Sequence, residues 1–336
     1  MTLVEDVYLF SNSEIGTFQG CPRKWWLAWF RGLTPRLKEV QGPRSTGTRI
    51  HIALGELYVL GGSAEKAIVA LNMAQMIDLS ALRAQLEFDE DLDLRVAKLQ
   101  SDFALEHIML EGYLEWIQET GIDASLEVVG VEQYLEVDFP MHLPHDPQKV
   151  KLIGKIDSRV RSRVTGRRLF IDHKTVQSVR DVTLNMNRQM LHYHLLEQMT
   201  TAPGEPRCDG ALYNMLRKVK RTRASKPPYY ARVPIDHNSH QIASYRSQIY
   251  GIIARIIEAH AYFRNRPANA VEQMQHQVAA PARPSRECSW CPFLQVCTMF
   301  DDGSRVEAAL EDLYEIKDPL SYYGAREKEG EHEQAQ

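Results

Sequence analysis

The chain has 336 residues, of which 44% are hydrophobic and 25% charged, and its formal net charge at pH 7 is -4. This composition is that of an ordinary soluble globular protein with one large domain or two fused ones. The slight negative charge argues against a uniformly basic surface, so any contact with nucleic acid must depend on a local patch.

The N-terminal residues do not show the basic and then apolar pattern of a secretory signal. No uninterrupted apolar run approaches the roughly 18 residues that a membrane-spanning helix needs. We therefore expect a cytoplasmic protein that does not enter a membrane. In that compartment its five cysteines are better suited to metal binding than to disulfides.

Residues 1–125 are expected to form a mostly helical region. Ser11-Asn-Ser-Glu14 fits a capping box, which predicts a helix that begins there. Further helices are predicted near 47–58, from Ala64 onward, and over about 94–119. The tryptophans at positions 25, 26 and 29 are expected to pack in the core rather than to stack on bases.

The pattern changes near Leu126, and residues 126–216 are expected to form the α/β core. Three β-rich runs lie at 126–139, 150–161 and 169–175, separated by prolines and by Thr165-Gly166. They predict a meander of adjacent strands. A helix over about 183–199 and a strand over 210–216 are expected to follow.

Residues 217–300 are expected to form a basic segment, a helix over about 241–264 and a cysteine-rich end. Six of the ten residues in 217–226 are cationic. A solvated loop and a phosphate-binding segment both fit this charge density. The candidate DNA contacts are Arg217, Lys218, Lys220, Arg221 and Arg223. Residues 301–336 are expected to be an extension, disordered from about 325 because apolar periodicity is absent there.

Three cysteines follow C-x2-C-x5-C spacing at Cys288, Cys291 and Cys297, and a fourth, Cys21, lies near the N-terminus. Three thiolates on one short segment leave a tetrahedral or cubane metal site one ligand short, and Cys21 can complete it by folding back. Zinc and an iron-sulfur cluster are both compatible with four thiolates. Cys208 is the spare cysteine.

Asp157 and Asp172-x-Lys174 lie at the ends of two successive predicted strands. Residues two apart in a strand share a face, and a hairpin would bring Asp157 alongside Asp172. Two carboxylates then suit Mg²⁺ or Mn²⁺, while the lysine offsets their repulsion and can stabilise charge on a phosphorane. This set of groups indicates hydrolysis of a phosphodiester.

Four short motifs occur in order: Gly47 to His51, Gly154 to Asp157, Asp172 to Lys174, and Gln189 to Tyr193. With the flanking cysteines, they resemble the PD-(D/E)xK nuclease superfamily, and within it the RecB-like branch with an iron-sulfur cluster. That branch includes the AddB nuclease domain, the fourth family of CRISPR-associated (Cas) proteins and their phage-encoded relatives. Isoleucine at 156 replaces the proline of the superfamily's name, as is common in this branch.

The resemblance implies a restriction-endonuclease-like core, in which a central mixed sheet is flanked by helices, with a helical N-terminal region and a C-terminal iron-sulfur region. It implies a [4Fe-4S] cluster on the four cysteines and a catalytic Mg²⁺ or Mn²⁺. The implied ligands of that ion are Asp157, Asp172, the His51 imidazole and the His173 carbonyl. Lys174 would act on the attacking water, Gln189 and Tyr193 would hold Lys174 or a DNA phosphate, and Glu132 matches an acidic position on the strand before the first aspartate.

Taken singly, each motif also fits a structural explanation: a turn aspartate, a core histidine, or a helix-surface pair. Together they favour a metal-dependent DNA exonuclease acting on single-stranded DNA or free ends in recombination, repair or processing. One alternative is a spacer-processing nuclease that works with a CRISPR integrase. Another is a non-catalytic iron-sulfur scaffold that binds DNA. The sequence contains no P-loop motif, so a helicase, recombinase or integrase would be a separate partner, and a homo-oligomer is possible.

Overall fold

The computed structural model describes residues 3–4, 7–85, 91–142, 149–180, 183–205, 207–264 and 279–323. The chain forms two compact units. Unit 1 contains Met1–Leu37, Glu136–Gly154 and His240–Gln336, and unit 2 contains Lys38–Leu135 and Lys155–Ser239. The segment 325–336, predicted to be disordered, lies outside the described residues.

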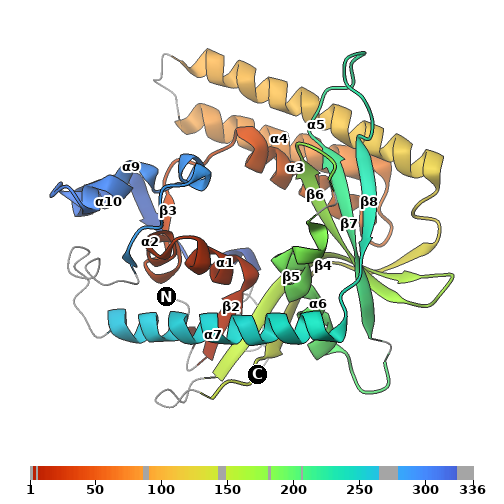
Figure 1. The fold of residues 1–336 in the computed structure, drawn as a ribbon. Helices are drawn as coiled ribbons and strands as arrows, with labels where there is room; N and C mark the ends of the chain where they lie inside the picture. The colour runs from red at the N-terminus through yellow and green to blue at the C-terminus, as the bar shows by residue number, and fades with distance from the viewer. Residues whose placement is uncertain are drawn as a thin grey trace, which may run out of the picture. The chain divides into compact units, whose positions relative to one another are not determined.

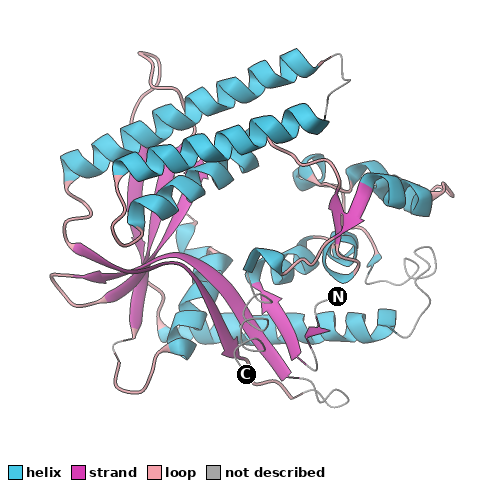
Figure 2. Cartoon of the chain, turned by 180° about the vertical axis from the view of Figure 1, so that it is seen from behind, coloured by secondary structure: helices cyan, strands magenta, loops and turns pink. Residues whose placement is uncertain are grey.

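The strands form a mixed sheet in the order β1-β2-β5-β6-β7-β8, with β4 beside β5. Their bounds are β1 Leu3–Val4, β2 Val7–Ser11, β4 Leu126–Asp138, β5 Lys149–Ser162, β6 Arg168–Val176, β7 Cys208–Arg217 and β8 Tyr230–Ile235. The β2–β5 and β6–β7 pairs are parallel, whereas β5–β6 and β7–β8 are antiparallel. The predicted central mixed sheet and the adjacency of the three predicted strands are confirmed. The long strands β4 and β5 are continuous along the chain from one unit to the other (Figure 2).

Helices cover both faces of the unit 2 strands. The helices of unit 2 are α3 Gly42–Tyr58, α4 Ala64–Gln85, α5 Leu92–Thr120 and α6 Arg188–Thr200. The first three lie side by side (Figure 1). The ring of Tyr58 in α3 stacks 5.2 Å from that of His173 in β6, and Phe170 in β6 contacts Tyr193 of α6 at 6.0 Å. Because alternate residues of a strand point to opposite faces, α3 and α6 flank β6 from opposite sides.

Two elements of unit 2 differ from the prediction. Helix α6 begins at Arg188 rather than near 183, because the Asn187 side chain accepts hydrogen bonds from the backbone N–H groups of Gln189 and Met190 and caps the helix there. A separate 3-10 turn occupies Leu184–Met186. Strand β8 was not predicted, since prolines at 227, 228 and 234 interrupt its pattern.

Unit 1 contains two short helices, a π-helical turn, a long helix and a C-terminal group of short elements. The bounds are α1 Asn12–Gly20, α2 Pro22–Trp25, the π-helical turn Trp26–Phe30, β3 Leu33–Pro35, α7 Ser239–Arg264, the 3-10 turns Arg286–Trp290, Thr298–Phe300 and Ser321–Tyr323, α9 Leu294–Cys297, α10 Val306–Leu313 and β9 Tyr314–Ile316. Strands β3 and β9 form a separate antiparallel pair.

The aromatic residues near the N-terminus form the core of unit 1, as predicted. Trp25 and Trp26 are fully buried, and Trp26 contacts both Phe263 and Phe300. The Ser11 hydroxyl caps α1 by accepting the Glu14 N–H at 3.1 Å. The Glu14 carboxylate accepts from the Trp25 indole N–H instead of closing the predicted capping box. The segment therefore builds the core as well as starting the helix.

One helix in the described part of the chain, α4, is long and apolar enough by length and composition to cross a membrane. A core helix of a soluble protein can pass the same test. In unit 2, α4 packs on α3 and α5 through Ala67, Leu71 and Leu82, which are buried.

Candidate active site

The hairpin between β5 and β6 places Asp157 and Asp172 opposite each other. The antiparallel register ends with Ser158 paired to Ile171, so each aspartate lies one position beyond this pair, and the charge of Asp157 acts on Asp172. The Asp157 Oδ2 atom accepts the backbone N–H of His173 at 2.8 Å. This bond fixes the first carboxylate against the strand that carries the second.

Lys174 lies against the carboxylate of Asp172. Its Nζ atom donates to Asp172 Oδ1 at 2.8 Å and lies 2.7 Å from Oδ2. The Oδ2 atom is buried and receives no hydrogen bond of good geometry from the described residues. The Lys174 ion pair is therefore the described contact of Asp172 Oδ2, and no well-aligned hydrogen-bond donor among the described residues occupies this oxygen.

Burial raises the pKa of Asp157 and of Asp172 to about 6, even though the positive charge of Lys174 acts in the opposite direction. Burial acts to lower the pKa of Lys174, but the charges of the two aspartates outweigh it and leave that pKa raised. At neutral pH the site thus contains two carboxylates and one ammonium group. Below about pH 6 the carboxylates begin to take up protons.

His51 reaches the same site from α3. Gly47, one turn earlier, allows this approach because a Cβ atom there would lie 3.2 Å from the Thr175 hydroxyl in β6. The His51 Nδ1 atom lies 3.5 Å from Asp157 Oδ2. Burial, and then the charge of Lys174, lower the pKa of His51, so its imidazole is neutral and can act as a ligand.

Glu132 stands beside these groups on β4. Its φ of 51° is left-handed, which is uncommon for a residue with a side chain and marks local strain. The carboxylate pairs with Lys155 at 2.7 Å, and its negative charge helps to raise the pKa of Asp157. The structure thus places Glu132 within electrostatic reach of the aspartates.

The His173 side chain points to the opposite face of β6. Its Nδ1 atom lies 2.8 Å from the Asn214 amide nitrogen, and its ring stacks on Tyr58. Burial holds the pKa of His173 well below its usual value. Its imidazole therefore packs on the α3 side of β6, where its ring lies 6.2 Å from that of His51, while its backbone N–H binds Asp157.

Gln189 and Tyr193 lie one turn apart on α6. The Gln189 Nε2 atom donates to the Tyr193 hydroxyl at 2.9 Å. The Tyr193 ring packs against Phe170, which shares its face of β6 with Asp172 and Lys174. Gln189 and Tyr193 therefore lie on the side of β6 that carries Asp172 and Lys174, and the hydrogen bond described here joins the two residues to each other.

Tyr213 is a further residue of the site that the sequence did not reveal. It pairs with Asp172 across the parallel β6–β7 register. Burial raises its pKa, and the charges of Lys174 and Asp172 both act on its hydroxyl. The only available signal was its place in a predicted neighbouring strand, and the register between two strands joined by a helix is not visible in the sequence.

The sequence matches the family model of the PD-(D/E)XK nuclease superfamily over residues 9–298. The chain belongs to this superfamily. No curated protein compared with the chain matches it. Superfamily membership implies a nuclease. Nucleases of this superfamily act on DNA and usually use Mg²⁺ or Mn²⁺.

The donor chemistry of the site fits the superfamily's divalent ion. Among the described residues, no group of three or more His, Cys, Asp or Glu side chains is arranged to hold a metal. The charge of Asp157 nevertheless acts on the buried carboxylate of Asp172, and the Oδ2 atom of Asp172 has an ion pair with Lys174 but no well-aligned hydrogen bond from the described residues. Hard oxygen donors of this kind suit Mg²⁺ or Mn²⁺.

The four cysteines of the predicted cluster all belong to unit 1 of the nuclease. They are free thiols, half-buried, and the described residues contain no cysteine metal site. The charges of Cys21 and Cys297 nevertheless act on Cys291, whose pKa burial raises. Cys21 and Cys297 therefore each lie within electrostatic reach of Cys291.

Arg23 organises the end of this cysteine segment. Its guanidinium donates to the Cys297 carbonyl at 2.8 Å and to the Cys297 Sγ atom at 3.8 Å, and it forms two hydrogen bonds with Asp301. Cys208 belongs to unit 2, where burial raises its thiol pKa to about 12. The spare cysteine thus belongs to a different unit from the other four.

Two arginines of the predicted basic segment already bind other groups of the protein. Arg217 donates to the carbonyls of Gln177 and Lys226, and Arg221 pairs with Glu115 at 2.7 Å. Burial lowers the pKa of Lys218. Lys220 and Arg223 are exposed, so these two are the best placed of the five for phosphate contact.

Proposed function

We propose that this nuclease is an exonuclease that removes nucleotides from free ends of single-stranded DNA in the cytoplasm, during recombination, repair or processing of DNA. One observation carries the proposal: Lys174 contacts both oxygens of Asp172, while Asp157 is fixed opposite by the His173 N–H. This arrangement can hold a divalent ion and a water molecule at one phosphate.

Asp157 and Asp172 would hold the ion, with the His51 imidazole and the His173 carbonyl as further ligands. When bound, a divalent ion supplies positive charge that polarises the phosphodiester and favours ionisation of water. The buried pair of carboxylates provides the negative charge that attracts such an ion. His51 stays neutral beside Asp157, so its nitrogen is available to the metal.

Lys174 would orient the attacking water and stabilise the charge that develops on the phosphate oxygens. Its raised pKa keeps the ammonium protonated at neutral pH. The lysine therefore acts as a hydrogen-bond donor rather than as the base. Gln189 and Tyr193 would position the phosphate or Lys174, and Lys220 and Arg223 would contact the DNA backbone, where each neutralised phosphate adds affinity.

The strand and end preference can be tested with two substrates. Linear end-labelled single-stranded DNA and a circular single strand of the same sequence are incubated with the protein and Mn²⁺. We expect the linear substrate to be degraded to short products and the circle to stay intact, because an exonuclease needs an end. Cleavage of the circle at the same rate would contradict the exonuclease proposal and leave a metal-dependent endonuclease.

We further propose that Cys21, Cys288, Cys291 and Cys297 hold a [4Fe-4S] cluster. The charges of Cys21 and Cys297 both act on Cys291, which supports a site shared by the two ends of the chain. Four thiolates also suit Zn²⁺, and the visible spectrum separates the two. We expect a brown protein whose broad visible absorption is lost in Cys291→Ser. Cys208→Ser is the matched control and should keep the absorption. A colourless protein with one bound zinc would contradict the cluster.

A further inference from the structure

Helix α4 of unit 2 presents an apolar stripe to solvent. Val69, Met73, Met76 and Ile77 expose 55%, 59%, 69% and 61% of their surface, respectively. They are spaced i, i+4, i+7 and i+8, so they lie on one side of the helix. The opposite side of α4 packs into unit 2. An apolar stripe of this extent on a charged protein marks an interaction surface.

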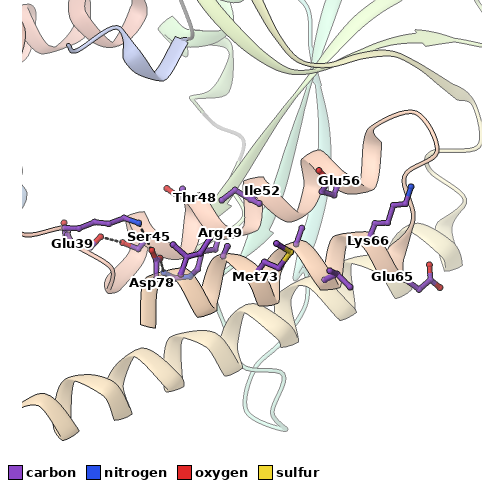
Figure 3. A pocket seen from close by; sticks show the side chains of 15 residues that line it. Glu39, Ser45, Thr48, Arg49, Ile52, Glu56, Glu65, Lys66, Met73 and Asp78 are labelled. Atoms are coloured by element: carbon purple, nitrogen blue, oxygen red, sulfur yellow. Dashed lines mark hydrogen bonds and ion pairs between the residues drawn. The ribbon is translucent and has the colours of Figure 1, made fainter. Parts of the chain in front are cut away.

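A hollow runs beside this stripe, between α3 and α4. It has a volume of about 780 Å³. Figure 3 shows Ile52 of α3 and Met73 of α4 among the side chains that line it. The protruding apolar stripe and the hollow therefore lie next to each other on one patch. Helices pack by fitting protruding side chains into hollows of this kind.

The charges around the hollow disfavour DNA and anionic membranes as the occupant. Its exposed rim carries three carboxylates and two lysines: Glu39, Glu56, Glu65, Lys38 and Lys66. Lys38 is already paired with Asp78 at 2.7 Å. A phosphate-rich partner would meet more negative than positive charge, so the occupant must be a protein surface of mixed charge.

The charges along α4 favour a second copy of the same helix. Glu65 lies in its first turn and Arg83 in its last, both exposed. They are 18 residues apart, which is about five helical turns, so they lie on the same side of α4 as each other. Glu65 also lines the hollow beside Val69 and Met73 of the stripe. In an antiparallel pair centred near Met73, Glu65 of each copy faces Arg83 of the other.

We propose that the exposed face of α4 is the two-fold interface of a homodimer. The stripe of each copy packs against the stripe and the hollow of the other, and two symmetric Glu65–Arg83 ion pairs flank this apolar centre. The orientation is antiparallel, since a parallel pair would place like charges together at both ends. The interface is isologous, as two-fold symmetry requires.

Charge reversal tests this arrangement because only self-association predicts rescue. The sedimentation coefficient of the purified full-length protein is measured over a range of concentrations. We expect a dimer, which Glu65→Arg or Arg83→Glu weakens about tenfold in dissociation constant by replacing two attractions with two repulsions. The double variant E65R/R83E should recover wild-type association to within about threefold.

The apolar centre is tested by Met73→Glu, which should weaken the dimer by at least about 100-fold because it buries charge without a partner. Val164→Glu is the matched control, since Val164 is 81% exposed in unit 2 outside the patch, and it should leave the dimer intact. Circular dichroism shows that each variant is folded. Three results would overturn the proposal. The wild-type protein could be monomeric at all concentrations, that monomer could associate with neutral lipid vesicles, or the double variant E65R/R83E could fail to recover wild-type association.

Discussion

Replacement of Asp172 by asparagine is expected to abolish DNA cleavage. The substitution keeps the size of the side chain but removes the negative charge that would hold the divalent ion, and it leaves Lys174 without its nearest carboxylate. We expect the rate on linear single-stranded DNA to fall by at least about 10³-fold, which corresponds to about 4 kcal/mol of transition-state stabilisation. Initial rates with saturating Mn²⁺ measure the effect.

A second variant separates chemistry from folding. Asp172 is buried, so its loss can also weaken the unit that carries it. Asp157 is less buried, with 14% of its side chain exposed, and the amide oxygen of an asparagine can still accept the His173 N–H. Asp157→Asn should therefore remain folded and be similarly inactive. Asp138→Asn, at an exposed position of β4, should cleave like the wild type; wild-type rates in both active-site variants would place the chemistry elsewhere.

The aspartates and lysine were visible in the sequence because their geometry is local. Asp172 and Lys174 share a strand face by the two-residue repeat, and one hairpin brings Asp157 opposite Asp172. The helix of His51 could also be predicted, but its distance to Asp157 could not. That distance depends on the packing of α3 against β6, where Gly47 leaves room beside Thr175.

The remaining features depend on contacts between residues far apart in the sequence. The register that places Tyr213 beside Asp172 is set across a helical connection. Arg221 forms an ion pair with Glu115, 106 residues away, so this part of the basic segment has a structural role. Composition alone cannot distinguish such an arginine from one that contacts phosphate. The apolar stripe on α4 was likewise hidden, because a helix whose two sides are both apolar does not reveal which side its own unit buries.

Helix α3 links the site to the stability of unit 2. It contributes His51 to the site and Arg49 to a buried ion network. Arg49 and Glu106 are almost completely buried, and the guanidinium contacts Glu106 and Asp78, both at 2.6 Å. Gln75 adds a hydrogen bond to Glu106 at 3.0 Å. The network joins α3, α4 and α5, so it fixes the helix from which His51 projects.

We expect Arg49→Met to destabilise unit 2 by roughly 3–5 kcal/mol, because it leaves the Glu106 carboxylate buried without its counter-charge. Urea unfolding followed by circular dichroism measures the change. Lys38→Met is the matched control: it removes the other cation that contacts Asp78, but Lys38 is 56% exposed, and such a pair contributes about 1 kcal/mol or less. Equal effects of the two variants would show that the buried network does not stabilise the three helices.

The double variant Arg49→Met/Glu106→Leu tests the cause. If the cost of the single substitution comes from an uncompensated buried carboxylate, removal of that carboxylate should restore much of the lost stability, since apolar side chains can replace a buried ion pair with little loss. Asp78 keeps its contact with Lys38 in this variant. A double variant as unstable as Arg49→Met would instead assign the loss to packing of the long arginine side chain, whose guanidinium lies 5.0 Å from the centre of the Phe103 ring.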